Sequence, residues 1–122
     1  MKKLQIITVF LLLSGYYTFL WADENKPRAL KAIPGNGVVY LSWSSPKNEA
    51  IGYLVYRALF DEKYQQLNDD PIEITFYKDN NVVNGEAYSY MVTAIDGNGN
   101  QGHQSVTVTI VSNGLSGAIG GY

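Results

Sequence analysis

The stretch from Asp79 to Asp96 constrains the fold more than any other part of the chain. Its first half repeats at every third position, with Asp79, Val82, Gly85 and Tyr88. From Tyr88 onward the residues alternate strictly, and one face of the alternation carries Tyr90, Val92 and Ala94. Such alternation is typical of a half-buried β-strand. A turn that leads into a strand with a tyrosine at its start predicts a tyrosine corner, a feature of antiparallel β-sandwiches.

Six further segments have strand character and are separated by turn signals. The clearest turns are Pro34-Gly35-Asn36-Gly37 and Asp96-Gly97-Asn98-Gly99-Asn100, because proline, glycine and asparagine supply the backbone conformations that turns require. The predicted strands span residues 28–33, 38–44, 51–59, 64–67, 75–78, 88–95 and 104–111. Seven short strands predict an all-β fold, a two-sheet antiparallel sandwich. The side chains expected in its core are Trp43, Tyr53, Val55, Tyr88, Tyr90 and Val92.

Several of these residues occur in short runs that, taken together, are specific to one kind of domain. The runs are Leu41 with Trp43, Tyr53-Leu-Val-Tyr-Arg57, Tyr77-Lys-Asp79, Val82, Gly85, Tyr88-Ser-Tyr90, Val92-Thr-Ala94-Ile-Asp96 and Gly99-Asn100. From about Pro27 to Ser112 the chain therefore resembles a fibronectin type III domain of the bacterial kind. The resemblance implies an immunoglobulin-like sandwich with sheets of three and four strands. It also implies a spacer or adhesive module without catalysis.

The chain departs from this family at two places. Residues 60–70 are only weakly patterned, which leaves the edge of the larger sheet undefined. The Arg-Gly-Asp triplet of some animal members is absent, since the turn reads Asp96-Gly97-Asn98, and integrin-type binding is not carried over.

The amino terminus has the pattern of an export signal. Lys2 and Lys3 precede the apolar run from Leu4 to Leu13, and Ala22 offers a cleavage point. We expect residues 1–22 to be a signal peptide, 23–112 the sandwich domain and 113–122 a flexible Gly-rich tail. The alternative is an uncleaved N-terminal anchor, because residues 4–22 carry no charge. Either reading places the domain outside the cytoplasm: secreted, periplasmic, at the cell surface or anchored to a membrane.

Composition narrows the classes of partner and cofactor. The 122 residues suffice for one domain and contain no cysteine, so disulfides are excluded. The net charge of −2 comes without a basic stripe, which argues against a nucleic-acid partner. Asp96, Asn98 and Asn100 have the spacing of a calcium loop, but Gln101 and Thr107 stand where a glycine and a bidentate glutamate are needed. We therefore predict no metal and no cofactor.

No group of residues predicts catalysis. The single histidine, His103, has Ser105 two residues away, but nothing supplies an orienting acid or an oxyanion hole. A carboxylate pair for glycoside hydrolysis would need a cleft, which a small sandwich does not provide. The loop acids are instead expected to be solvated: Asp61, Glu62, Asp69, Asp70 and Glu73.

The remaining candidate is a contact surface made of apolar side chains. Leu54 and Tyr56 are expected on the outer face of their strand, where polar residues are usual, unless the segment 60–67 covers them. The predicted contact surface comprises Leu54, Tyr56, Phe60 and Tyr64, and further surface aromatics are Tyr40 and Phe76. We expect a non-catalytic interaction, adhesion or spacer module whose partner is an unknown protein or polysaccharide. The alternative is a carbohydrate-binding accessory domain of an extracellular polysaccharide-degrading system.

Overall fold

A computed structural model describes residues 24–60 and 62–113 of the chain. The predicted signal segment at 1–22 and residues 114–122 of the predicted tail lie outside the described residues. Within the described ranges, no helix is long and apolar enough to cross a membrane.

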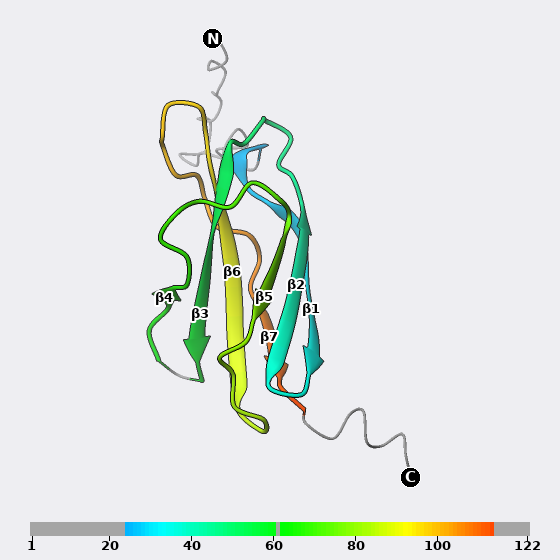
Figure 1. Ribbon diagram of the computed structural model, residues 1–122. Helices are drawn as coiled ribbons and strands as arrows, with labels where there is room; N and C mark the ends of the chain where they lie inside the picture. Colours follow the sequence, from blue (N-terminus) through cyan, green and yellow to red (C-terminus); the bar gives the residue numbers. More distant parts are fainter. Residues whose placement is uncertain (1–23, 61, 114–122) are drawn as a thin grey trace, which may run out of the picture.

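Seven strands form two antiparallel sheets that pack face to face (Figure 1). The strands are β1 (Arg28–Gly35), β2 (Val38–Ser44), β3 (Gly52–Leu59), β4 (Gln65–Gln66), β5 (Phe76–Asp79), β6 (Ala87–Ile95) and β7 (Val108–Val111). The smaller sheet has the order β1-β2-β5, and the larger one has the order β4-β3-β6-β7. The predicted all-β sandwich, with its division into three and four strands, is confirmed.

The core lies between the sheets and is built by the alternation of β2, β3 and β6. All six side chains predicted to face inward are buried there, and Val55, Tyr90 and Val92 are fully so. Trp43 of one sheet meets Tyr53 of the other edge to face, with ring centroids 5.4 Å apart at 70°. Burial of one such large apolar side chain contributes about 1.5–3 kcal/mol, so this packing is the main source of stability in a chain without disulfides.

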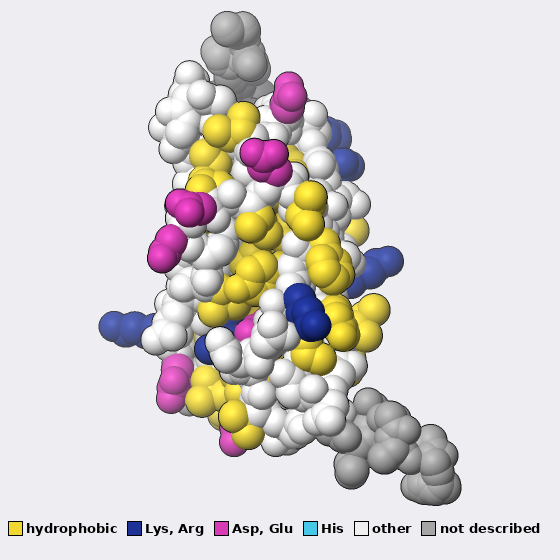
Figure 2. Space-filling model, viewed as in Figure 1, with side chains coloured by type: hydrophobic (Ala, Val, Ile, Leu, Met, Phe, Trp, Pro, Cys, Tyr) yellow, Lys and Arg dark blue, Asp and Glu magenta, His cyan; other side chains and the backbone are white. Residues whose placement is uncertain are grey.

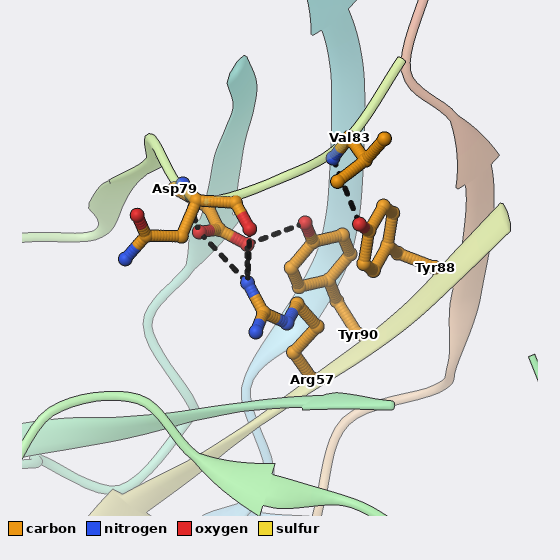
Figure 3. Close-up of polar contacts among 6 residues, drawn as sticks. Arg57, Asp79, Val83, Tyr88 and Tyr90 are labelled. Atoms are coloured by element: carbon orange, nitrogen blue, oxygen red, sulfur yellow. Dashed lines mark hydrogen bonds and ion pairs between the residues drawn. The ribbon is translucent and has the colours of Figure 1, made fainter. Parts of the chain in front are cut away.

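The tyrosine corner is present at the start of β6. The backbone N–H of Val83 donates a 2.8 Å hydrogen bond to the Tyr88 hydroxyl, as Figure 3 shows. Between them Gly85 has a φ of 92°, a left-handed conformation that glycine adopts without strain. The turn before β6 is therefore held by Tyr88, the second residue of the strand.

A buried ion pair joins the two sheets next to this corner. Asp79 of β5 is only 3% exposed, and its carboxylate accepts hydrogen bonds of 3.1 and 3.2 Å from the Arg57 guanidinium of β3. The Tyr90 hydroxyl of β6 donates a further bond of 2.7 Å to the same carboxylate (Figure 3). The Asn81 N–H donates another, and the guanidinium lies 5.3 Å from the centre of the Tyr88 ring. A charge this deeply buried needs such partners to be tolerated.

Two predicted elements differ from the structure by more than one residue at an end. The strand β1 continues through Pro34 to Gly35, so the turn is shorter than predicted. Pro34 lies on an edge strand, where sheets tolerate proline. The last strand, predicted from residue 104, begins only at Val108. Ser105 interrupts it, because its hydroxyl accepts the Val92 N–H that a strand carbonyl would otherwise bind.

The corner yields a first prediction. Tyr88→Phe removes only the hydroxyl and leaves the Val83 N–H without its acceptor, so we expect a loss of about 1–3 kcal/mol in the free energy of unfolding. Urea denaturation measures this loss. Tyr40→Phe, at an exposed ring, is the matched control and should stay within about 0.5 kcal/mol. Equal effects of the two changes would contradict a stabilising role for the corner.

A second prediction concerns the carboxylate of Asp79. Asp79→Ala leaves Arg57 and the Tyr90 hydroxyl without their shared partner, and we expect a loss of about 3–5 kcal/mol. Tyr90→Phe should cost clearly less in the Asp79→Ala background than in the original chain, since its partner is already gone. A double-mutant cycle by denaturation tests this, and strict additivity would show that the hydroxyl and the carboxylate are not coupled.

A third prediction follows from the ionisation of Tyr90. Burial of the phenol, its hydrogen bond to Asp79 and the charge of that carboxylate raise the pKa of Tyr90 well above its ordinary value of 10.0. Above pH 10 the unfolded state releases this proton while the folded state keeps it, so the free energy of unfolding should fall as the pH rises. Denaturation between about pH 8 and 11.5 measures the decline. The Tyr90→Phe variant should show a shallower decline, and identical slopes would refute this assignment.

Candidate binding surface

The Ser105 hydroxyl forms hydrogen bonds with the backbone, and the His103 side chain lies on the surface. The Ser105 hydroxyl is buried, accepts the Val92 N–H at 2.9 Å and donates to the Val106 carbonyl at 2.9 Å. The proton of the Ser105 hydroxyl therefore stabilises the irregular backbone that precedes β7. Among the described residues no hydrogen bond joins Ser105 to His103, whose side chain is exposed. Ser105 thus has a structural role, and His103 is a surface residue that it does not contact by a hydrogen bond among the described residues.

The loop acids of the described chain are solvated. Glu62, Asp69, Asp70 and Glu73 are all exposed, while Asp61 lies outside the described residues. Within residues 24–60 and 62–113, no three His, Asp or Glu side chains are grouped closely enough to hold a metal ion.

The three residues Asp96, Asn98 and Asn100 form a hydrogen-bonded turn. One carboxylate oxygen of Asp96 accepts the backbone N–H groups of both asparagines at 2.9 Å. These bonds favour the ionised form and lower the pKa of Asp96, with the Asn100 bond contributing most. Gly99 closes the turn with a φ of 85° and donates its N–H to the Asp96 carbonyl. A carboxylate that bonds its own backbone two residues on is ordinary turn chemistry.

The expectation that Leu54 is exposed is wrong. Its side chain is only 8% exposed, although it lies on the outer face of β3. Gln101, from the segment between β6 and β7, donates to the Tyr56 hydroxyl at 2.8 Å and to the Thr93 hydroxyl at 3.0 Å. Because Thr93 is the register partner of Leu54, the Gln101 side chain lies across this face at the rows of Leu54 and Tyr56.

The other members of the predicted contact surface lie toward the edge of the larger sheet. The segment 60–67, which was the alternative cover for Leu54, contributes β4 to the edge of the sheet, where Gln66 pairs with Tyr56. Tyr56 and Tyr64 are half-buried, and Phe60, just beyond the end of β3, is 72% exposed. A contact role for Phe60 and Tyr64 stays a prediction.

The outer face of the smaller sheet carries an exposed aromatic pair. Tyr40 of β2 is 36% exposed and Phe76 of β5 is 44% exposed. Their ring centroids are 6.3 Å apart, with 29° between the ring planes. Tyr40 stands opposite Lys78, and Ser42 stands opposite Phe76, so the two rings are diagonal neighbours on adjacent strands. Such pairs lie within reach of each other on a sheet surface.

Further apolar and basic side chains surround this pair. Ile33 of β1 stands opposite Tyr40, Lys31 stands opposite Ser42, and the Lys78 ammonium lies 5.8 Å from the centre of the Tyr40 ring. In Figure 2, hydrophobic side chains run through the middle of the view to the lower right, with basic side chains beside them at the right, while most acidic side chains lie at the top, left and bottom. We call this surface the Tyr40 face. It comprises Lys31, Ile33, Tyr40, Ser42, Phe76 and Lys78.

Comparison with known proteins relates the chain to modules of larger proteins. No protein-family model matches it. It is 42% identical over 73 residues to an amylopullulanase of Thermoanaerobacter thermohydrosulfuricus, a match that covers 59% of this chain and 5% of the relative. It is 35% identical over 80 residues to an amylopullulanase of Thermoanaerobacterium saccharolyticum, covering 66% of this chain and 6% of that protein. The chain thus spans only a small part of the relatives that it matches.

Solved structures match the sandwich over most of the described chain. An Fn3-like protein from Clostridium thermocellum superposes with a TM-score of 0.63 at 25% identity, covering 74% of this chain and 94% of that one. The FN5 domain of Drosophila Lar superposes with a TM-score of 0.61 at 21% identity, covering 75% and 98%. Together with the strand order and the Tyr88 corner, these likenesses show that the described part of this chain has the fold of a fibronectin type III domain.

Proposed function

We propose that this chain is an exported, non-catalytic interaction module that contacts carbohydrate in a polysaccharide-degrading system. The observation that carries the proposal is its likeness to amylopullulanases. The matched segments are 73 and 80 residues long, the size of one small domain, within proteins that are many times longer. A module of this size in such enzymes fits an accessory role beside a separate catalytic region.

The chemistry of the described side chains supports a role without catalysis. The Ser105 hydroxyl bonds the backbone of β6, and the Asp96 carboxylate bonds its own turn. Asp79 is occupied by Arg57 and Tyr90 in the core. A catalytic centre needs such groups aimed at a site where a substrate can sit, and these groups are aimed at the protein itself.

An inert spacer is the rival function, and the Tyr40 face favours contact over spacing. Two aromatic rings stand exposed side by side on the smaller sheet. Exposed apolar groups that gather at one place mark contact surfaces, whereas a spacer can carry polar side chains at the same positions. Aromatic rings also present flat apolar faces that suit the apolar faces of sugar rings.

Export is part of the proposal because of the basic and apolar pattern in residues 1–22. A cleaved signal would place the domain in the periplasm, at the cell surface or in the medium, and a retained segment would anchor it to the membrane from outside the cytoplasm. The mass of the mature chain would distinguish the two, because cleavage removes the first 22 residues.

Co-sedimentation of the purified chain with insoluble polysaccharides tests the proposal. The panel is granular starch, cross-linked pullulan and pectate gel, and the supernatants are assayed for new reducing ends. We expect retention on at least one polysaccharide, weaker retention for Tyr40→Ala and Phe76→Ala, and no release of reducing ends. Ile51→Ala, which shortens an exposed apolar side chain just before β3 and outside both candidate surfaces, is the matched control. Retention on none of the three would favour a spacer or a protein partner, and release of reducing ends would refute a non-catalytic role.

A further inference from the structure

The charges on the Tyr40 face are segregated from those of the rest of the chain. The chain as a whole has a net charge of −2, with eleven Asp and Glu residues against nine Lys and Arg. The Tyr40 face nevertheless presents Lys31 and Lys78, and the only acidic residue in its three strands is Asp79, which is buried in the core. A basic surface on an acidic protein attracts anionic partners.

The hydrogen-bonding groups of this face also favour an anionic partner, because donors predominate over acceptors. A lysine ammonium only donates hydrogen bonds, and the outward acceptors on this face are the hydroxyls of Ser42 and Tyr40. The hydroxyls of a neutral sugar both donate and accept, so they would find few acceptors here. A carboxylate on the sugar would supply acceptors for the two ammonium groups through charge-assisted bonds, which are stronger than neutral ones.

The basic groups lie on the two strands that flank β2, the strand of Tyr40. Lys31 lies on β1 and Lys78 on β5, with β2 and its Tyr40 between them. Neighbouring strands are about 4.8 Å apart, so the two lysine positions are separated by about 10 Å across the sheet. A polysaccharide laid over Tyr40 and Phe76 could therefore bring acidic groups on successive sugars to both lysines.

We propose, resting on the function proposed above, that the Tyr40 face binds an acidic polysaccharide whose sugars carry carboxylates. The sugar rings stack on Tyr40 and Phe76, and their carboxylates pair with Lys31 and Lys78. A second copy of the chain fits this face less well, because a twofold contact would bring two basic faces together, and like charges disfavour such a contact.

Affinity electrophoresis of the full chain in gels that contain polygalacturonate or pullulan tests the proposal. We expect binding to polygalacturonate to be at least about tenfold tighter than binding to pullulan, the ratio expected from one charge-assisted hydrogen bond. Raising the salt from about 0.02 M to about 0.5 M should weaken the polygalacturonate complex, because salt screens exposed charges. Equal or tighter binding to pullulan would overturn the acidic ligand but leave the proposed carbohydrate-binding function intact. Binding to neither polymer would contradict the proposed ligand, and the starch arm of the sedimentation panel then decides the broader function.

Variants separate this face from general attraction between a cation and a polyanion. Lys78→Gln and Tyr40→Ala should each lower the affinity for polygalacturonate about tenfold. Lys63→Gln removes an exposed lysine between β3 and β4, at the other sheet, and should leave the affinity unchanged. Thermal unfolding of each variant checks that the fold is intact. An equal loss for Lys63→Gln and Lys78→Gln would show non-specific attraction and overturn the proposal.

Discussion

The arrangement of the two sheets depends on the hydrogen bonds that the buried Asp79 carboxylate accepts. Hydrophobic packing between two sheets is non-directional, so it favours contact without fixing one relative position. The Asp79 carboxylate adds direction, because it accepts hydrogen bonds from Arg57 of β3 and Tyr90 of β6 while it is itself part of β5. A shift of one sheet past the other would leave the Asp79 carboxylate without its partners in the core. This restraint also fixes the position of the two outer faces of the sandwich relative to each other.

Sequence reasoning predicted the core because alternation reports which face of a strand is buried. Trp43, Tyr53 and Tyr90 were all placed inward by this argument, and all three are buried. The ion pair was missed, although a signal was present. Arg57 shares the inward parity of Tyr53 and Val55, and an inward arginine requires a buried acceptor. Asp79 opens the three-residue repeat that leads to the corner, and its position beside a predicted strand could have suggested that acceptor.

The outer surfaces were harder to predict because their contacts join distant parts of the chain. Leu54 is shielded on a face that Gln101 crosses, and Gln101 is separated by 45 residues from its partner Tyr56. No local pattern reports such a contact. The aromatic pair shows the same limit, because Tyr40 and Phe76 belong to β2 and β5, whose pairing only the topology establishes. One outer face is thus crossed by a loop side chain, and the other leaves Tyr40 and Phe76 exposed.

The Tyr88 corner also bears on the order in which the chain folds. Its hydrogen bond joins residues only five positions apart, whereas Arg57 and Asp79 are separated by 22. The entropy lost on closing a loop grows with the length of the loop, so the corner closes at a smaller entropic cost than the ion pair. A turn that closes at this smaller cost can orient the beginning of β6 before that strand pairs with β3. The same hydroxyl that stabilises the finished sandwich can therefore narrow the conformations that the chain samples on the way to it.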